Sequence, residues 1–493
     1  LTTSSAASDV YKRQNQYFEK ETDATTLGKW TGWDKLYPSY QATVSIPEAY
    51  EGKKVKIKDV VIDPTERLAD ANIFDNRIRD NISWHFDSYV WNYPDWKKFH
   101  INYRPDIWWN AYDGFKLGWH MNGNYMKKKH NFWLTAWYNT RLFQGNLPNQ
   151  AIQSNDNQYY TNDRFNYNFW YNTALDQVLP NTDITIASRM LDGLYLREIE
   201  IEKEFKNKLN VSLGFKSMER EEINDRNYLI YPDEWDIEKN NASLNFGLNY
   251  SVSDPKRNYV GELNILARTS VSQDVNYQFI ELDYIENIKL WRLNWSSRFY
   301  GRMGTKNTPT ESSVYLAGAN GEAMVDNKYV RSSGFLPNEW IGEYGKTSNH
   351  FHHGGGLNLR GYAGYFAVEE DNAGKPIQAY RGNSGFSINT ELEFDNIIQL
   401  KRARKLKSHF DFDSYLFVDA GVLSYINTDK KSQWSSWRAD AGVGASLTIK
   451  RWFKLYNTKP LTIRFDIPFV VSNAPAGENN VAFRWVLGFN RAF

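Results

Sequence analysis

From about residue 83 onward, the chain consists of stretches of roughly ten residues in which apolar and polar side chains alternate. Residues 244–252, for example, read Leu-Asn-Phe-Gly-Leu-Asn-Tyr-Ser-Val, and residues 441–449 read Ala-Gly-Val-Gly-Ala-Ser-Leu-Thr-Ile. Successive side chains of a β-strand point to opposite faces, so this period of two predicts strands with one apolar and one polar face. The polar set is rich in Gly, Ser and Asn, which is typical of a packed or wet interior.

The composition indicates which surroundings the two faces meet. The 493 residues include 19 Trp, 32 Tyr and 28 Phe, yet the mean hydropathy is negative. No run of 18 apolar residues is present, so no transmembrane helix is expected. A closed barrel in a bilayer combines an apolar outer band and two aromatic girdles with a polar interior. We therefore predict an all-β fold, a transmembrane antiparallel β-barrel in the outer membrane of a Gram-negative bacterium.

Charge and motifs exclude several other classes. The 59 Lys and Arg residues balance 58 Asp and Glu residues, so no nucleic-acid partner is expected. The chain has no cysteine, no HExxH, no GxSxG and no P-loop, so we assign no catalytic, metal or cofactor-binding residue and expect no cofactor. The cluster of His350, His352 and His353 would suit a metal ion. No carboxylate lies at ligand spacing, so a polar loop start is favoured.

The alternation predicts about sixteen strands and one very long loop. If the last strand ends in the periplasm, eleven strands precede and five follow the segment 302–383, which then lies outside the cell. Dividing 183–205 into two strands rests on a tight turn at Asp192-Gly193. The strands are predicted near residues 99–111, 114–125, 130–142, 164–174, 183–191, 193–205, 208–219, 241–253, 258–269, 276–288, 291–301, 384–396, 410–422, 437–450, 459–470 and 480–493.

The chain ends in an aromatic residue on an alternating strand. Phe489 and Phe493 belong to the predicted last strand, and a terminal aromatic at this place resembles the signal that barrel-assembly machinery reads. The alternative is an ordinary edge strand of a soluble protein. We expect the first and last strands to pair and so to close the barrel, and we predict that a disulfide engineered between them forms.

The residues before the barrel have a different character. Residues 1–14 resemble translated sequencing-adapter sequence and are expected to be an artefact or disordered. Residues 15–82 are predicted to be the end of a periplasmic β-domain with a linker, and residues 83–493 the barrel. The chain starts without an initiator Met or a visible signal peptide, so we interpret it as the C-terminal part of a longer protein.

The long loop carries a short motif near its end. The segment 354–362 reads Gly-Gly-Gly-Leu-Asn-Leu-Arg-Gly-Tyr, and 417–421 reads Phe-Val-Asp-Ala-Gly. An (L/V)RG(F/Y) motif on a lumenal loop, and an aromatic-x-Asp-x-Gly motif on the second strand after it, are features of the Omp85 superfamily, also called the bacterial surface antigen or D15 family. The chain resembles this family over roughly residues 99–493. The resemblance implies a loop that plugs the lumen.

An arginine inside a barrel must be paired, because a desolvated lone charge is costly. Asp419 shares a strand face with Gly421, and this face points inward if the aliphatic face meets lipid. We therefore predict that Arg360 pairs with Asp419 and locks the loop. The predicted structural residues of this lock are Arg360, Gly361, Tyr362, Asp419, Gly421, Glu391 and Glu393. The alternative is a solvated Arg360 without a special partner.

A second resemblance concerns the start of the chain. The residues Val60-Val61-Ile62-Asp63-Pro64, followed by Leu68, Asp70, Asn72 and Asn76, look like the last strand and exit of an M1-type (gluzincin) metallopeptidase. Some Bacteroidota proteins carry such a peptidase before an outer-membrane barrel. The zinc motif is absent here, so this resemblance implies a catalytic region upstream.

These observations leave three functions open. The first is an Omp85-like barrel that anchors an upstream peptidase-like domain or acts as its conduit. The second is a protein translocase or insertase, although the residues before 99 lack the helical periodicity of POTRA repeats. The third is a passive porin or transporter, which the plug-like loop disfavours. The expected partners are outer-membrane lipid, the barrel-assembly machinery, and periplasmic or surface proteins.

Overall fold

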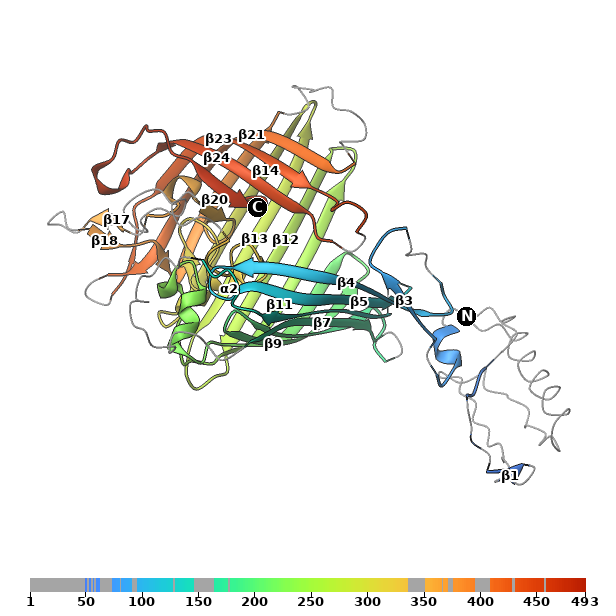
Figure 1. The fold of residues 1–493 in the computed structure, drawn as a ribbon. Coiled ribbons are helices and arrows are strands. Elements are labelled where there is room, and N and C mark those ends of the chain that lie inside the picture. Colours follow the sequence, from blue (N-terminus) through green and yellow to red (C-terminus); the bar gives the residue numbers. More distant parts are fainter. Residues whose placement is uncertain are drawn as a thin grey trace.

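The computed structural model shows a closed β-barrel with a small segment attached at one end (Figure 1). From β4 (Phe99–Asn110) to β25 (Val486–Phe489), the long barrel strands pair antiparallel in the order of the sequence, whereas β3 (Ile82–Phe86) and β16 (Phe351–His353) add short parallel ladders. The structure describes residues 49–50, 53–54, 56, 59–62, 73–79, 81–90, 95–126, 129–145, 164–175, 178–335, 351–365, 367–370, 376–394, 408–427, 431–455 and 458–493.

All sixteen predicted strands are present, which confirms the predicted fold class. Each strand pairs with the next of these strands along the chain, in a register that keeps its apolar residues on one face. The strands are β4 (Phe99–Asn110), β5 (Gly114–Tyr125), β6 (Lys129–Asn139), β7 (Phe165–Ala174), β8 (Thr182–Leu191), β9 (Leu194–Phe205), β10 (Leu209–Glu219), β11 (Asn241–Asp254), β12 (Tyr259–Ser270), β13 (Gln278–Leu290), β14 (Leu293–Gly304), β20 (Ser384–Glu393), β21 (Phe410–Ile426), β23 (Arg438–Ile449), β24 (Leu461–Val471) and β25 (Val486–Phe489).

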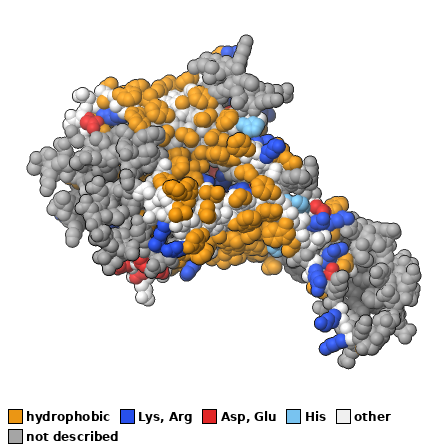
Figure 2. Space-filling view, in the orientation of Figure 1, with side chains coloured by type: hydrophobic (Ala, Val, Ile, Leu, Met, Phe, Trp, Pro, Cys, Tyr) orange, Lys and Arg blue, Asp and Glu red, His pale blue; other side chains and the backbone are white. Residues whose placement is uncertain are grey.

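The two faces of the barrel wall differ as the alternation predicts. Apolar side chains on the outside are well exposed, for example Leu213 at 60%, Phe246 at 47% and Ile280 at 54%. On the face shown in Figure 2, apolar side chains form a broad band over the barrel. Inward neighbours such as Ser243 and Asn245 are buried. An apolar exterior around a polar interior is stable only in contact with lipid. No helix in the described part of the chain is long and apolar enough to span a bilayer.

The closure of the barrel differs from the prediction. The expected direct pairing of the first and last strands is wrong for the described residues, because the ladders of β25 are with β24 and with β16 (Phe351–His353), and the first strand β4 pairs on its other edge with β3 (Ile82–Phe86). Strand β3 pairs in parallel with β4, from Ile82 opposite Phe99 to Phe86 opposite Tyr103. A residue beyond β3, Ser88, forms an isolated bridge with Leu455 in the connection between β23 and β24. The segment before the barrel therefore occupies the edge that the last strand was expected to use.

The last strand is also shorter than predicted. Strand β25 spans Val486–Phe489 rather than 480–493, and Gly488 and Phe489 are both buried, so the alternation stops there. Asn490 has a positive φ of 67°, which turns the chain out of the strand. The turn carries Arg491 to the carboxylates of Glu393 and Asp413 inside the barrel. This internal ion pairing explains why the terminal residues leave the wall.

Short elements gather at the end of the barrel away from β3, which we call the loop end (Figure 1). Their apolar residues, Leu357 and Leu359 among them, form one core with wall residues such as Leu423. The long loop between β14 and β20 contains η6 (Thr310–Ser312), β15 (Val314–Tyr315), α2 (Gly321–Met324), β16 (Phe351–His353), η7 (Arg360–Tyr362), β17 (Ala367–Glu370), β18 (Pro376–Gln378) and β19 (Arg381–Gly382). Other loops contain η4 (Ile223–Tyr228), η5 (Pro232–Glu234), β22 (Ser432–Trp434) and η8 (Pro475–Gly477).

The described part of the N-terminal segment is small. It contains β1 (Ala49–Tyr50) paired with β2 (Lys53–Lys54), and η2 (Ile73–Asn76), with a bridge between Val61 and Arg77. The predicted artefact at 1–14 and most of the peptidase-like motif lie outside the described residues. The predicted β-domain at 15–82 therefore stays a prediction.

Candidate functional site

The tip of the long loop turns sharply inside the barrel. Gly356 and Asn358 have positive φ values of 56° and 58°, a conformation that glycine and asparagine adopt most readily. A Cβ at Gly356 would lie 2.6 Å from the carbonyl oxygen of Tyr315, so only glycine fits. The turn buries Leu357 and Leu359 completely and directs Arg360 into the wall.

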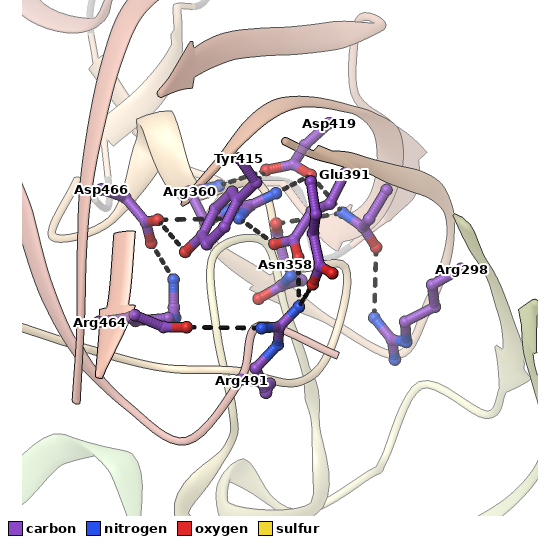
Figure 3. A network of polar contacts seen from close by, with 12 residues as sticks. Arg298, Asn358, Arg360, Glu391, Tyr415, Asp419, Arg464, Asp466 and Arg491 are labelled. Atoms are coloured by element: carbon purple, nitrogen blue, oxygen red, sulfur yellow. Dashed lines mark hydrogen bonds and ion pairs between the residues drawn. The ribbon is translucent and has the colours of Figure 1, made fainter. Parts of the chain in front are cut away.

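Arg360 binds two carboxylates from neighbouring strands (Figure 3). Its Nε and Nη2 donate to the two oxygens of Asp419 at 2.8 and 3.0 Å, and its Nη1 donates to Glu391 at 2.6 Å. The guanidinium carbon also lies 3.8 Å from the ring centroid of Phe417. We call Arg360, Asp419 and Glu391 the Arg360 lock. It fastens the loop to β20 and β21 by a bidentate bond and a second charge-assisted bond.

The lock is fully enclosed. Arg360 and Asp419 are 0% exposed, and Glu391 is 2% exposed. Burial alone would lower the pKa of the Arg360 guanidinium, but Asp419 and Glu391 raise it well above its usual value. The side-chain amide of Asn389 donates to Asp419 at 3.1 Å and to the carbonyl oxygens of the turn at 3.2 Å. The lock therefore holds one guanidinium and two carboxylates in direct contact with one another and away from solvent.

Glu391 connects the lock to the end of the chain. Its other oxygen lies 3.4 Å from Nη2 of Arg491, which also pairs with Glu393 and, at 3.0 Å, with Asp413. Of the two glutamates predicted to share the role, Glu391 contacts Arg360, whereas Glu393 contacts Arg491. Phe493 follows and lines a cavity with Arg491. The loop tip and the C-terminal residues thus share one carboxylate.

A second branch of the network reaches β16. The hydroxyl of Tyr415 donates to Asp466 at 2.6 Å, and Asp466 in turn pairs with Arg464. Arg464 also donates to Nδ1 of His352. In Figure 3, Tyr415 and Asp466 lie beside Arg360, and Arg464 lies next to Asp466. Through these contacts the network connects β21, β24 and β16.

The remaining predicted residues surround the lock. A Cβ on Gly361 would lie 2.6 Å from the Cβ of Asp440, and one on Gly421 would lie 2.8 Å from the carbonyl oxygen of Phe386. Glycine at both positions permits this close packing. Tyr362 is 0% exposed, and its hydroxyl lies 3.3 Å from that of Ser472. All the predicted lock residues except Glu393 thus lie at the loop tip or against it.

Two further ionic anchors hold the loop to other parts of the wall. Glu322 of α2 accepts a bidentate bond from Arg268, at 2.7 and 2.9 Å, and pairs with Lys216. Arg331 donates to Asp192 at 2.9 Å, in a cluster that also includes Lys116. These anchors were not predicted, because their residues lie far apart in sequence and no motif marks them.

The pKa values of two buried carboxyls near the loop, Asp192 and Glu311, are shifted in opposite directions. Burial alone would raise the pKa of Asp192, but Lys116 and Arg331 hold it well below its usual range. Glu311 of η6 accepts from the side chain of Asn241 at 2.7 Å and from the backbone N–H of Asp236 at 3.2 Å. Burial raises the pKa of Glu311 to about 7. The loop therefore contains a carboxyl that titrates near neutral pH.

The arrangement of these groups holds a loop in place. Among the described residues, no group of three His, Asp or Glu side chains could hold a metal ion, and His350 lies outside them. His352 and His353 are buried, where His352 contacts Arg464 and His353 donates to the carbonyl oxygen of Phe489 at 3.2 Å. The described site therefore consists of ion pairs between a loop and the wall of the barrel.

A closed barrel with a lipid-compatible exterior and a loop-filled polar interior defines this chain as an outer-membrane β-barrel. Among solved structures it is similar to BamA from Haemophilus ducreyi lacking POTRA domains 1-3, with 15% identity and a TM-score of 0.40 over 80% of this chain and 70% of that one. It is also similar to CdiB from Escherichia coli, with 12% identity and a TM-score of 0.40 over 80% and 62% of the two chains.

CdiB from Acinetobacter baumannii is similar as well, with 11% identity and a TM-score of 0.38 over 79% of this chain. The chain spans 62% and 59% of the two CdiB chains. At these identities the similarity concerns the fold. No protein-family model matches the chain, and no curated protein matches it.

Proposed function

We propose that this chain is an Omp85-like barrel that inserts or translocates polypeptides at the outer membrane. The single observation that carries the proposal is the Arg360 lock, in which a loop tip of the sequence Leu-Arg-Gly-Tyr binds Asp419 on the second strand after the loop. This pairing is what the resemblance to the Omp85 superfamily implies. Barrel-assembly machinery is the proposed partner during its own insertion.

The loop argues against a passive pore. It is anchored through Arg331 to Asp192, in the turn between β8 and β9, and through Arg360 to β20 and β21. These strands are well separated around the sheet, so the loop crosses the lumen. A pore that conducts small solutes needs a continuous wet path. We therefore expect the purified barrel to conduct ions poorly in planar bilayers, and an Arg360→Ala variant to conduct more. A large, steady conductance of the unaltered barrel would instead support a porin.

The direct test is an assay with client proteins. The purified chain is reconstituted in liposomes, an unfolded outer-membrane barrel is added, and folding of the client is followed by its heat-modifiable mobility on gels. We expect faster client folding than in empty liposomes, and slower folding with Arg360→Ala. A control liposome carries an unrelated outer-membrane barrel of similar size. Equal rates with the unaltered chain, in empty liposomes and with the unrelated barrel would exclude the insertase, and the same comparison with a secreted client would exclude the translocase.

A second candidate function is favoured by β3. This strand attaches the preceding segment to β4 over five residue pairs, as an anchor for an upstream domain requires. We infer that a peptidase-like region, if the complete protein has one, is held at the membrane in this way. The complete coding sequence distinguishes the candidates, because an upstream HExxH supports an anchored peptidase and POTRA repeats support a translocase. With HExxH present, chelator-sensitive peptide hydrolysis by the full chain is the expected result.

A further inference from the structure

At the loop end of β5, β6 and β7, the apolar exterior of the barrel extends beyond the strands. Leu142 and Phe143, which follow β6, are 59% and 77% exposed, and Phe165, the first residue of β7, is 65% exposed. Phe143 meets Phe115 of β5 edge-on, with ring centroids 5.7 Å apart, and Phe165 meets Tyr138 of β6 at 5.4 Å. We call Phe115, Tyr138, Leu142, Phe143 and Phe165 the rim patch. Contiguous exposed apolar side chains of this kind mark a contact surface.

The turn that carries part of the rim patch has a strained backbone. Arg141 and Phe143 have positive φ values of 61° and 59°, which bulky side chains rarely adopt. The backbone N–H of Arg141 donates to the carbonyl oxygen of Asp113 at 2.8 Å, and the indole of Trp109 donates to the carbonyl oxygen of Phe143 at 2.7 Å. These bonds fix the turn while the ring of Phe143 stays exposed. Strain that the surroundings enforce in this way points to a function for the residues it presents.

The rim patch continues the lipid-facing surface of the barrel wall. Ile107, Leu117, Tyr138 and Phe165 are opposite one another on β4, β5, β6 and β7, so they form one outward row across four strands. Ile107 and Leu117 are both more than half exposed. Because an exposed apolar row on a barrel exterior is stable only against hydrocarbon, acyl chains lie along it. The loop-end part of the rim patch therefore meets lipid near the level of the headgroups.

Two arginines border the rim patch at the loop end. Arg164, which directly precedes β7, is exposed, and its Nη1 donates to the hydroxyl of Tyr138 at 3.1 Å. This hydroxyl is a neutral group, so it does not compensate the charge of the guanidinium. Arg141 lies on the neighbouring segment, since the backbone N–H of Asn139 donates to the carbonyl oxygen of Arg164 at 2.7 Å. Positive charge and exposed apolar surface therefore meet at one place on the barrel exterior.

We propose that the rim patch, with Arg141 and Arg164, binds a phosphate-bearing lipid of the outer leaflet. The phosphate binds the two guanidinium groups, whose planar forks of N–H donors match its oxygens. The acyl chains lie along the outward row. Basic side chains beside apolar surface at a membrane interface are a general means of binding anionic lipid. The site is separate from the Arg360 lock and does not depend on the proposed function. Its assignment to the outer leaflet follows the predicted topology, in which the loop end faces the exterior.

Native mass spectrometry of the purified barrel in detergent measures its affinity for a defined lipid. The probe is lipid A with both phosphates, and dephosphorylated lipid A is the neutral counterpart. We expect the phosphorylated lipid to bind about tenfold more tightly than the neutral one, and Arg164→Gln to weaken its binding about fivefold. Arg141→Gln/Arg164→Gln should weaken it further. The matched control is Arg257→Gln, which removes a side chain that is 85% exposed from a turn at the other end of the barrel. Equal affinities of the double variant and this control would overturn the proposal.

Two further measurements separate a lipid from a free anion. Phe143→Ser/Phe165→Ser removes apolar contact but keeps both arginines, so the affinity for phosphorylated lipid A should fall. Inorganic phosphate at millimolar concentration should not displace the bound lipid, because it cannot use the outward row. Displacement by phosphate would mean that the arginines bind a free anion. An unchanged affinity of Phe143→Ser/Phe165→Ser would mean that charge alone attracts the lipid. Either result would refute the proposed site.

The last controls concern folding and protein partners. Heat-modifiable mobility on gels shows whether each variant is folded. A higher ionic strength should weaken binding of phosphorylated lipid A to the unaltered barrel, because salt screens exposed charges, and this measurement needs no variant. A salt-independent affinity would contradict the site. A second copy of the chain is the alternative occupant. If the unaltered barrel formed a dimer in detergent that Phe143→Ser/Phe165→Ser dissociated, while both bound the lipid equally, the rim patch would be a protein contact and the proposal would be wrong.

Discussion

Buried charges at the loop end are satisfied by specific partners, and Arg360 illustrates the principle. Its guanidinium binds both oxygens of Asp419 and one oxygen of Glu391, with no part exposed. Short motifs were sufficient to predict the pairing of Arg360 with Asp419. The anchors at Glu322 and Asp192 could not be predicted, because Asp192 lies 139 residues from its partner Arg331. Proximity of this kind comes from barrel closure and leaves no local pattern.

The Arg360 lock gives the first prediction. Arg360→Ala leaves two buried carboxylates without their cation, so we expect the free energy of unfolding to fall by about 3–5 kcal/mol. Arg360→Lys keeps the charge but lacks the planar guanidinium fork, so its free energy of unfolding should lie between those of the unaltered barrel and of Arg360→Ala. Urea titrations in liposomes, with heat-modifiable mobility as the readout, measure both. Arg257→Ala is the control, because its side chain is 85% exposed. An Arg360→Ala barrel as stable as this control would disprove the lock.

The second prediction concerns pH. The pKa of Glu311 is raised by burial to about 7 in the folded state, whereas an exposed Glu titrates near 4.3. The folded loop therefore binds more protons than the released loop between these values. Its stability is fully present at low pH and is lost as the pH rises toward and through 7, by on the order of 3 kcal/mol.

Hydrogen exchange of residues 310–324 measures this effect. Protection should be higher at pH 5 than at pH 8, and Glu311→Gln, which cannot ionise, should flatten the dependence. Glu222, whose residue is exposed, provides a control substitution to Gln that should leave the dependence intact. A protection factor that is the same at both pH values in the unaltered loop would contradict the expectation.

At the scale of elements, the structure departs from the sequence pattern at the two ends of the barrel. The pattern of β3 is as regular as that of any strand, with Ile82, Trp84 and Phe86 exposed. The alternation does not indicate with which strand β3 pairs or in which direction it runs, so a parallel strand beside β4 could not be predicted. The early end of β25 could not be predicted either, because it depends on the ion pairs of Arg491 with Glu393 and Asp413, which form across the lumen.

The third prediction tests the partner of β4. Ser83 and His100 are opposite in the parallel ladder, and their side chains lie 3.1 Å apart. A Ser83→Cys/His100→Cys variant should therefore form a disulfide readily on mild oxidation. A His100→Cys/Val486→Cys pair, which would join the first and last strands directly, should not. The opposite result on non-reducing gels would restore the simpler closure by β4 and β25.

At the scale of the whole molecule, periodicity predicted the number and order of the strands because lipid and lumen impose opposite demands on alternate residues. The fourth prediction uses this contrast. Leu248 lies between the exposed residues Phe246 and Tyr250, midway along β11, whereas Asn249 faces the lumen and donates to Glu262 at 2.9 Å. Leu248→Arg should cost about 2–4 kcal/mol in a bilayer.

Asn249→Arg is the matched control and should cost less, because its charge meets water and the carboxylate of Glu262. Reversible folding into liposomes measures both variants. Similar losses for the two substitutions would mean that the faces of β11 are assigned to the wrong sides. A larger loss for Asn249→Arg would invert the assignment.

In the long loop, β16 and the Arg360 lock are close together in sequence, with only residues 354–359 between His353 and Arg360. Both ends of this stretch are fixed, one by backbone pairing to β25 and the other by the carboxylates of β20 and β21. The number of residues in this stretch is therefore more important than the identity of most of its side chains. One inserted residue would leave either the strand or the arginine out of place.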